Sequence, residues 1–544
     1  MTRTRETLVA GAAIVVLTIF VTWPQCWYLG TRVAAHDDSY FSMWRLAWIA
    51  HALATDPRHL FDANIFHPAR GALAFSDAML VEGLVGAPFF WAGTSPILVY
   101  NLLLLGGIAA SGLAMFVLAR HVIGAMAPAL VAAAIFTMAP YRIEHFMHLE
   151  LQWAMWMPLT LWAFHRAIDK GAWRFGILGG VFLWLQVVSS VYYGVFLAMI
   201  TVAFVVLLLG SAPRRARAAL PGLIGGVLVA LLLTIPYALP YLSNARRLGP
   251  RSTEAVAAFS ATPLDYFVSP PQNWLWGWTA ATGSGAERNL FPGVLAIALA
   301  AAAFGYRPRR LVFVYFAIAA LSIELSLGLN GRLYSWLFDH VGTLQGFRAP
   351  ARFAVIACCA IAVLAGFGAK VLFRRLSAAG AGVAKGAVAL TFLLLAIEYR
   401  NTGMILTELV YDPPSVYNVY KAVRTLGPGT VVELPLPRLD RLPGHEAHYA
   451  FASIGHWYPL VNGYSGYYPG EYIETVVRME MFPDDRSIAR LRNLGVRYLI
   501  FHPHLYARGE YASLATRLAQ RPELRPYGTF PAQGEHAELF LLEK

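Results

Sequence analysis

The sequence predicts an α-helical membrane protein with many transmembrane segments and a C-terminal α/β domain. Of its 544 residues, 58% are hydrophobic and only 14% are charged, whereas about a quarter of the residues in soluble proteins are charged. Apolar runs of about 20 residues alternate with short basic loops, which is the pattern of helices that span a bilayer. From about residue 402 the pattern changes to short apolar stretches that are typical of strands.

The distribution of positive charge indicates a membrane rather than a nucleic-acid partner. The net charge is +12, but many of the arginines gather in short clusters between apolar runs, as in the cytoplasmic loops of membrane proteins. We therefore expect membrane lipids around the chain and no nucleic acid. The three cysteines, Cys26, Cys358 and Cys359, lie in or beside apolar segments and match neither a disulfide framework nor a C-x-x-C motif.

The basic clusters also orient the helices. With Arg3 and Arg5 on the cytoplasmic side, their alternation predicts about eleven transmembrane helices and an outer C-terminus. The first apolar run is expected to be an uncleaved signal anchor. The predicted helices cover approximately 8–29, 96–118, 126–140, 151–165, 175–189, 192–210, 219–240, a segment ending at Arg307, 311–328, 353–369 and 383–397.

We expect two domains. Residues 1–401 form a transmembrane domain whose long first outer loop, 30–93, includes an apolar run that dips into the membrane without crossing it. Residues 402–544 form an extracytoplasmic α/β domain of a size sufficient for one small fold. Within it, TVVELPLP, VRYLIF and ELFLLEK predict strands, and 417–425 and 487–494 predict helices.

The strongest candidate for a catalytic site directly follows the first apolar segment, at His36, Asp37 and Asp38. Carboxylates at a membrane face are costly unless they are solvated, paired or used in chemistry. A carboxylate held near a membrane-embedded donor can serve as a general base. A helical stretch follows, which makes Asp38 a first-turn residue and the preferred base, with Asp37 as the second choice. The alternative is a solvated loop or helix cap. His36 and Asp77 are candidate substrate-binding residues in the same loop.

A second polar cluster lies in a predicted outer loop. Glu144, His145, His148 and Glu150 fall within seven residues, and a helical turn would place the two histidines on one face. Imidazole and carboxylate groups are ordinary metal ligands, so a divalent metal ion is a chemically reasonable cofactor. Hydrogen bonding to a phosphate or to the aspartate cluster is the favoured role, and an interfacial loop without an active role is the alternative.

Five arginines on the predicted outer side depart from the positive-inside rule. Arg246, Arg247 and Arg251 follow one outward helix, and Arg348 and Arg352 precede a later inward one. A guanidinium group binds phosphate in a bidentate geometry, which makes these side chains candidate ligands for a lipid phosphate. The four-residue spacing of Arg348 and Arg352 would place both on one side of a helical start. The alternative is contact with lipid headgroups.

The C-terminal domain contains a loop rich in glycine, proline and aromatic residues. Its histidine, amide and phenol side chains include His456, Asn462 and Tyr464. Such groups suit the binding of a sugar or a polar headgroup. The favoured alternative is that they pack the loop onto the membrane domain.

Several stretches together resemble bacterial polytopic proteins of the GT-C glycosyltransferase superfamily. They are HDDSYFSMWRLAWIAHAL, HLFDANIFHPARGALAFSD, PYRIEHFMHLELQWAMWMPLTL, GFRAPARFA, HWYPLVNGYSGYYP and RNLGVRYLIFH. The resemblance implies a polyprenyl-phosphate-linked sugar donor, inversion at the anomeric carbon, and a catalytic aspartate in the first outer loop, which maps onto Asp38 or Asp37. It also implies a place in the bacterial cytoplasmic (inner) membrane, with the active site and C-terminal domain on the periplasmic side.

On that resemblance we expect a glycosyltransferase that moves a hexosyl or pentosyl group to a glycan, lipid or protein acceptor. Asp38 would deprotonate the acceptor hydroxyl, while the arginines and His148 would hold the departing phosphate. The alternatives are a flippase for lipid-linked saccharides, a non-catalytic envelope assembly factor, and a ligase that uses histidine and arginine. A flippase would be expected to have repeated halves and charged residues within its spans, and neither is evident in the sequence.

Overall fold

The computed structural model describes residues 3–211, 213–282, 285–409, 418–532 and 535–543. Its contacts divide the chain into two compact units. Unit 1 comprises Met1–Tyr28, Leu102–Leu239 and Gly249–Ile405, and unit 2 comprises Leu29–Asn101, Pro240–Leu248 and Leu406–Lys544. Composition predicts a domain boundary near residue 402, and this boundary stays a prediction. Each compact unit combines segments that lie far apart in the sequence.

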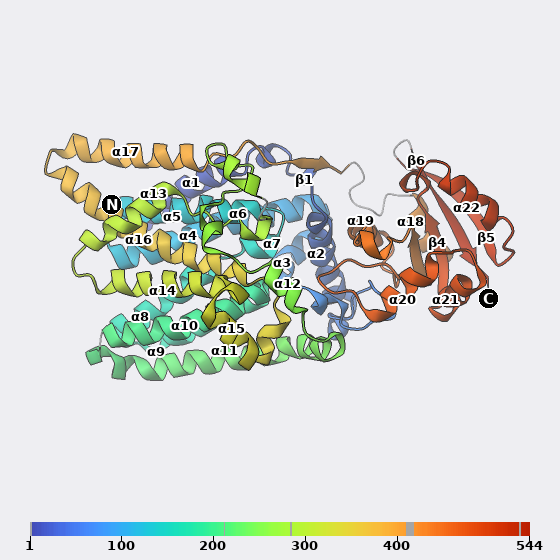
Figure 1. The fold of residues 1–544 in the computed structure, drawn as a ribbon, viewed down its shortest axis with the longest axis horizontal. Coiled ribbons are helices and arrows are strands. Elements are labelled where there is room, and N and C mark those ends of the chain that lie inside the picture. The colour runs from blue at the N-terminus through green and yellow to red at the C-terminus, as the bar shows by residue number, and fades with distance from the viewer. Residues whose placement is uncertain (1–2, 212, 283–284, 410–417, 533–534, 544) are drawn as a thin grey trace. The chain divides into compact units, whose positions relative to one another are not determined.

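Unit 1 is a bundle of helices, and each of the eleven predicted apolar segments contains one. They are α1 (Arg3–Val21), α4 (Pro96–Ile123), α5 (Met126–Met138), α8 (Trp156–Lys170), α9 (Trp173–Ser189), α10 (Val191–Ser211), α11 (Pro213–Leu248), α13 (Val294–Ala302), α14 (Arg310–Ser326), α16 (Ala354–Ser377) and α17 (Ala381–Glu398). The division into units falls within α4 and α11. Figure 1 shows α8, α9, α10 and α11 running side by side.

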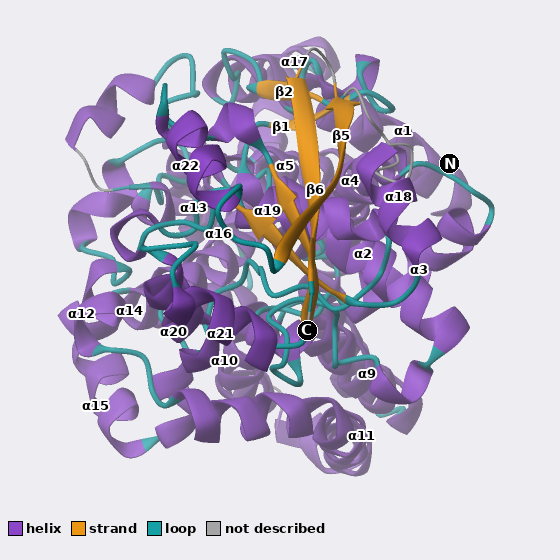
Figure 2. Ribbon diagram, turned by 90° about the vertical axis from the view of Figure 1, so that its right-hand side faces the viewer, coloured by secondary structure: helices purple, strands orange, loops and turns teal. Residues whose placement is uncertain are grey.

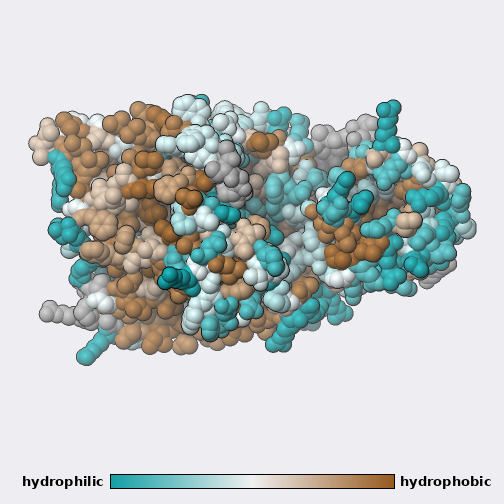
Figure 3. All heavy atoms as spheres, viewed as in Figure 1, coloured by the Kyte–Doolittle hydropathy of each residue, from teal (hydrophilic) through white to brown (hydrophobic). Residues whose placement is uncertain are grey.

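Seven helices among the described residues are long and apolar enough to cross a membrane. The candidate spans are Thr4–Val21, Pro96–Ile123, Met126–Glu144, Val191–Gly210, Arg217–Leu248, Pro350–Ser377 and Ala381–Glu398. Figure 3 shows hydrophobic residues covering much of the visible face of the helices in unit 1. The predicted α-helical membrane fold is therefore confirmed. The remaining four predicted helices, α8, α9, α13 and α14, have 9 to 17 residues, and the number of eleven crossings stays a prediction.

Close helix packing fixes parts of this bundle. In α9, Gly176 and Gly180 face Gly222 and Gly226 of α11, and a Cβ atom on Gly180 would lie 2.0 Å from the carbonyl oxygen of Gly226. Glycines at this spacing allow two helix backbones to approach each other directly. A bulkier residue at any of these positions would force the two helices apart.

Unit 2 contains a four-stranded sheet with the order β3-β4-β6-β5. Strand β3 (Thr430–Leu434) is parallel to β4 (Val496–Phe501), whereas β6 (Glu535–Leu542) is antiparallel to both β4 and β5 (Leu524–Ala532). The helices of this part are α18 (Asn418–Leu426), α19 (Glu446–Ala452), α20 (Gly470–Met479), α21 (Asp485–Asn493) and α22 (Glu510–Leu518). Figure 2 shows the sheet with these helices beside it. The predicted small α/β fold is confirmed; the predicted helix start at residue 417 lies outside the described residues.

Residues 30–93, the predicted first outer loop, belong to unit 2 together with the C-terminal sheet. It contains β1 (Arg32–Ala34), α2 (Asp37–Thr55) and α3 (Leu80–Trp91), and β1 pairs with β2 (Leu406–Glu408). Farther along, the backbone of residues 64–67 is hydrogen-bonded to that of residues 460–462. The backbone N–H of Phe66 donates to the carbonyl oxygen of Asn462 at 2.9 Å, and the backbone N–H of Leu460 donates to the carbonyl oxygen of Asn64 at 2.7 Å. The loop is therefore joined to the C-terminal segment by a backbone ladder.

Candidate active site

Asp38 lies in the first turn of α2, as the sequence predicted. His36 is the N-cap residue, and its Nδ1 accepts a hydrogen bond from the backbone N–H of Asp38 at 3.1 Å. Two carboxylates in a first turn also interact favourably with the positive end of the helix dipole. The Asp38 side chain keeps 19% of its surface exposed, so it is only partly covered by the protein.

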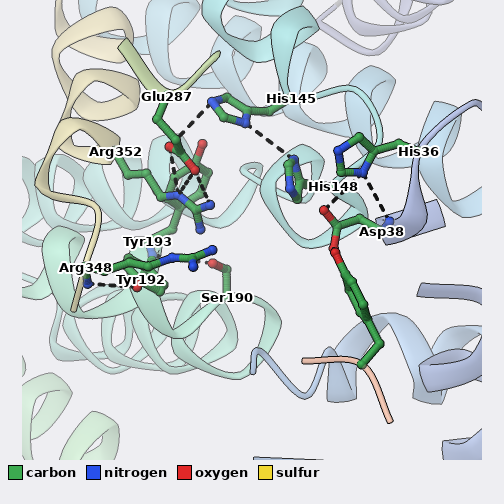
Figure 4. A network of polar contacts seen from close by, with 11 residues as sticks. His36, Asp38, His145, His148, Ser190, Tyr192, Tyr193, Glu287, Arg348 and Arg352 are labelled. Atoms are coloured by element: carbon green, nitrogen blue, oxygen red, sulfur yellow. Dashed lines mark hydrogen bonds and ion pairs between the residues drawn. The ribbon is translucent and has the colours of Figure 1, made fainter. Parts of the chain in front are cut away.

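Each oxygen of the Asp38 carboxylate has a neighbour within unit 2. Its Oδ1 accepts a hydrogen bond from the Tyr464 hydroxyl at 3.1 Å, and its Oδ2 lies 3.2 Å from His36 Nδ1. Figure 4 shows the His36 and Asp38 contact. Burial and the charges of Asp38 and Asp37 raise the pKa of Tyr464, so its hydroxyl stays protonated and remains a donor.

Asp37 faces a different neighbour. Its Oδ1 lies 3.8 Å from Nδ1 of His448 in α19, and its side chain is 34% exposed. The His448 ring packs on Tyr40 of α2 with centroids 4.0 Å apart. Burial lowers the pKa of His448, although the charge of Asp37 opposes this. The two adjacent aspartates therefore occupy different surroundings, and only Asp38 receives the tyrosine hydroxyl.

A second cluster lies in unit 1 and centres on Glu287, which the sequence analysis did not identify. Nε of Arg352 donates to Oε1 and Oε2 of Glu287 at 3.1 and 3.2 Å, and its Nη2 also contacts Oε1. His145 Nε2 lies 3.7 Å from Oε2 of the same carboxylate. Figure 4 shows Glu287 between Arg352 and His145. Burial would raise the pKa of Glu287, but the charges of Arg352 and His145 lower it to about 2.

The three consecutive residues 287–289 tie their loop to three different partners. Glu287 binds Arg352, Arg288 binds Asp265 with Nε 2.8 Å from Oδ2, and Nδ2 of Asn289 donates to Glu144 Oε1 at 3.1 Å. The loop is therefore fixed at three adjacent points. No local sequence signal indicated these pairings, because the partners lie 23 to 145 residues away.

Arg348 and Arg352 differ in their partners despite their spacing. Arg352 lies in the short 3₁₀ helix Pro350–Phe353, whereas Arg348 precedes it in a loop, so the expected shared helical side is not formed. The Arg348 guanidinium packs over the Phe259 ring at 5.2 Å, and the described residues provide no carboxylate that pairs with it. Its backbone N–H donates to the Tyr192 hydroxyl at 3.1 Å. Arg348 is thus the more available of the two for an external anion.

The histidine and carboxylate cluster predicted at 144–150 is partly assembled. His145 and His148 lie in the turn between α6 (Pro140–Glu144) and α7 (Leu149–Gln152), not on one helix, yet their Nδ1 atoms are 3.4 Å apart. Glu144 and Glu150 are both buried. No group of three or more histidine, cysteine or acidic side chains is arranged to hold a metal ion within the ranges that the structure describes.

The remaining predicted site residues lie in unit 2. Asp77 is buried, and its carbonyl oxygen accepts from Arg45 at 2.6 Å. Arg246 and Arg247 lie in the last turn of α11, where Arg247 donates to Asn244 at 2.7 Å. His456 is buried, and its Nδ1 accepts from the backbone N–H of Tyr458. These contacts are internal to unit 2.

Asn462 is fully buried and supports the segment that carries Tyr464. Its Oδ1 accepts from the Glu433 amide at 2.7 Å, and its Nδ2 donates to the Glu433 carbonyl and to Glu446 Oε1 at 2.9 and 3.1 Å. The Gly463 amide donates to Glu446 Oε2 at 2.6 Å. The predicted substrate amide at 462 is therefore engaged within the protein.

No protein-family model and no curated protein sequence matches this chain. Solved structures do align with it. The archaeal oligosaccharyltransferase AglB from Archaeoglobus fulgidus, solved with an inhibitory peptide and a dolichol-phosphate, aligns over 98% of this chain and 74% of its own length, at 13% identity and a TM-score of 0.51. The arabinofuranosyltransferase AftD from Mycobacteria aligns over 100% of this chain at 13% identity and a TM-score of 0.57.

This likeness concerns the fold. The chain spans 42% of the length of AftD, and a fold shared at such low identity does not transfer a substrate or an acceptor. AglB and AftD are both GT-C glycosyltransferases. The predicted GT-C fold, with its transmembrane helices and its small C-terminal sheet domain, is confirmed.

Proposed function

We propose that this chain, which has the fold of the GT-C glycosyltransferases, is itself a membrane glycosyltransferase. It transfers a sugar from a polyprenyl-phosphate-linked donor to a hydroxyl group of a glycan, lipid or protein acceptor. The transfer takes place at the outer, periplasmic face of a bacterial inner membrane and inverts the anomeric carbon. The dolichol-phosphate in the AglB structure supports a lipid-phosphate donor of this chemical class.

The observation that carries the proposal is the environment of Asp38. Its carboxylate is partly exposed, begins a helix and is hydrogen-bonded by a neutral phenol. A general base must keep a lone pair available for the proton that it abstracts. Asp38 meets that requirement, so it would take the proton of the acceptor hydroxyl as the new glycosidic bond forms.

The departing group of such a reaction is a lipid phosphate, which leaves without needing a proton. It requires positive charge or hydrogen-bond donors that stabilise the developing charge. Arg348 is our first choice for this role, because its guanidinium has no carboxylate partner among the described residues. His148 is the second choice, and Arg352 ranks below both because Glu287 already binds it.

A lipid analysis tests the function directly. Cells that lack the gene are expected to accumulate a polyprenyl-phosphate-linked sugar, detected by mass spectrometry of extracted lipids. The same lipid is then purified and added to proteoliposomes that contain the wild-type protein, with a membrane extract as the acceptor source. Release of polyprenyl phosphate is the expected result. If no such lipid accumulates, or if the purified lipid is not consumed, the proposed function is wrong.

The proposed orientation has its own test. A cysteine introduced at Arg438, an exposed side chain of the C-terminal domain, should react with a membrane-impermeant thiol reagent added to intact spheroplasts. A cysteine at Lys385, at the start of α17, should react only after lysis. The reverse labelling pattern would place the C-terminal domain in the cytoplasm.

A further inference from the structure

We propose that Tyr464 is a positioning residue for Asp38 and not a substrate contact. In this role its hydroxyl holds the Asp38 carboxylate in one orientation and favours the ionised form that accepts a proton. The inference rests on the proposed function, in which Asp38 is the general base. The inference gives the C-terminal domain a part in the reaction, because that domain supplies the Tyr464 hydroxyl, 426 residues after Asp38 in the chain.

Tyr464 lies against both the Asp38 carboxylate and the helix that carries it. The Tyr464 hydroxyl lies 3.1 Å from Asp38 Oδ1, within ordinary hydrogen-bonding distance. The Tyr464 ring packs edge-on against Phe41 of α2 with centroids 5.2 Å apart. Both the ring and the hydroxyl of Tyr464 are therefore held against the helix that carries the aspartate.

Buried hydrogen bonds restrain the segment that directly precedes Tyr464. Asn462 and Gly463 bond to Glu433 and Glu446 in the interior of unit 2. A Cβ atom on Gly463 would lie 2.7 Å from the ring of Phe66, so only glycine fits there. A loop restrained at two consecutive residues offers a well-defined donor, as a positioning group requires.

Titratable groups lie close to both Asp38 and Asp37. His36 Nδ1 lies 3.2 Å from Asp38 Oδ2, Asp37 adjoins Asp38 on α2, and His448 of α19 faces Asp37. The negative charge of Asp37 opposes ionisation of Asp38, whereas a donor to the charged form favours it. Tyr464 supplies such a donor without adding a charge that would compete for the substrate phosphate.

Chemical labelling measures the effect of the Tyr464 hydroxyl on the protonation of Asp38 without any substrate. Carbodiimide with glycinamide modifies protonated carboxyl groups, so the pH at which labelling of Asp38 is half-maximal reports its protonation, as read by peptide mass spectrometry. In full-length Tyr464→Phe we expect that midpoint to rise by about one pH unit, because a hydrogen bond to the charged form is lost. Labelling of the exposed Asp440 is the internal reference and should not change.

Two further variants control for folding. Tyr458→Phe is the matched control, because its hydroxyl meets the Arg424 carbonyl at 3.5 Å and not Asp38; its midpoint should equal that of the wild type. Replacement of Tyr464 by 3,5-difluorotyrosine keeps the shape but strengthens the donor, and the Asp38 midpoint should fall. An Asp38 midpoint that is unchanged in both Tyr464 variants would overturn the proposal.

Kinetics separate this proposal from the proposed function. With the donor lipid purified from the deletion strain, Tyr464→Phe should lower kcat about tenfold with little change in KM. The double variant Tyr464→Phe/Asp38→Asn should be no less active than Asp38→Asn alone, because both substitutions act through the Asp38 carboxylate. A raised KM with unchanged kcat would make Tyr464 a substrate contact and overturn the inference. Full activity in Asp38→Asn would instead refute the base, while the labelling result would still decide whether Tyr464 and Asp38 are coupled.

Discussion

The two carboxylates at the centre of the two clusters, Asp38 in unit 2 and Glu287 in unit 1, are similarly buried but differently paired. Their side chains are 19% and 13% exposed. Glu287 binds a guanidinium through both oxygens, whereas one oxygen of Asp38 receives a neutral phenol and the other lies beside an imidazole. Two carboxylates of similar burial can therefore differ in the charge of their partners, and we propose that this charge decides which of them is free to react.

The consequence for chemistry follows from what each partner leaves available. A carboxylate engaged by a bidentate guanidinium has its lone pairs committed and its charge neutralised. A carboxylate held by a neutral donor keeps its negative charge and can still accept a proton. We therefore propose that Glu287 holds the fold of its loop and that Asp38 takes part in the reaction.

Asp38→Asn is expected to have the largest effect on activity. The amide keeps the shape of the side chain but removes the base, so turnover should fall by about two to four orders of magnitude, measured as release of polyprenyl phosphate in proteoliposomes. Asp37→Asn is the matched control and should lose less. Equal activity in Asp38→Asn and the wild type would remove the basis for the assignment.

Glu287→Ala is expected to reduce stability more than any exposed change. It leaves the buried Arg352 guanidinium without its partner, which costs about 3–5 kcal/mol when a buried ion pair loses one member. The thermal unfolding midpoint in detergent should fall accordingly. Glu408→Ala, which removes an exposed pair with Arg32, should cost less than about 1 kcal/mol. Similar midpoints for the two variants would contradict the structural role of Glu287.

The same pair predicts a pH dependence. The pKa of Glu287 is lowered from 4.5 to about 2 by Arg352 and His145, against the effect of burial. A carboxyl group whose pKa is lower in the folded chain contributes stability above its unfolded pKa and loses it as the pH falls. The unfolding midpoint should therefore decline between about pH 4.5 and pH 2, and this part of the decline should be absent in Glu287→Gln. A profile shared by the variant and the wild type would count against the pair.

Arg348→Lys is expected to have the smallest effect. Lysine keeps the positive charge but lacks the planar fork that binds phosphate, so the apparent affinity for the donor lipid should weaken by about 2- to 10-fold while thermal stability stays near that of the wild type. Arg352→Lys should instead lower stability, because it disturbs the contact with Glu287. If both variants behave as the parent, the phosphate ligand must be sought among Arg246, Arg247 and His148.

The sequence was a good guide wherever the signal is local. The period of apolar residues located the helices of unit 1, the strands β3, β4 and β6 follow from short apolar stretches, and Asp38 was placed in a first turn because a helical stretch follows it. Each of these features depends on neighbours within about two helical turns.

The partners of the charged groups were not predictable in this way. Glu287 and Arg352 are 65 residues apart, and Tyr464 and Asp38 are 426 apart. One sequence shows which residues can form ion pairs but not which of many combinations the fold brings together. The four-residue spacing of Arg348 and Arg352 predicted that both would lie on one side of a helical start. This was wrong, because the helical turn begins only at Pro350 and the two guanidinium groups face different partners.

The backbone ladder between 64–67 and 460–462 has a consequence for how the protein is made. The amides of Phe66 and His67 donate to the carbonyls of Asn462 and Leu460, which the ribosome adds nearly 400 residues later. At about 5–20 residues per second, residues 64–67 must wait roughly 20–80 s for this pairing segment. During that interval residues 64–67 lack their pairing segment, so this ladder forms only after most of the chain has been synthesised.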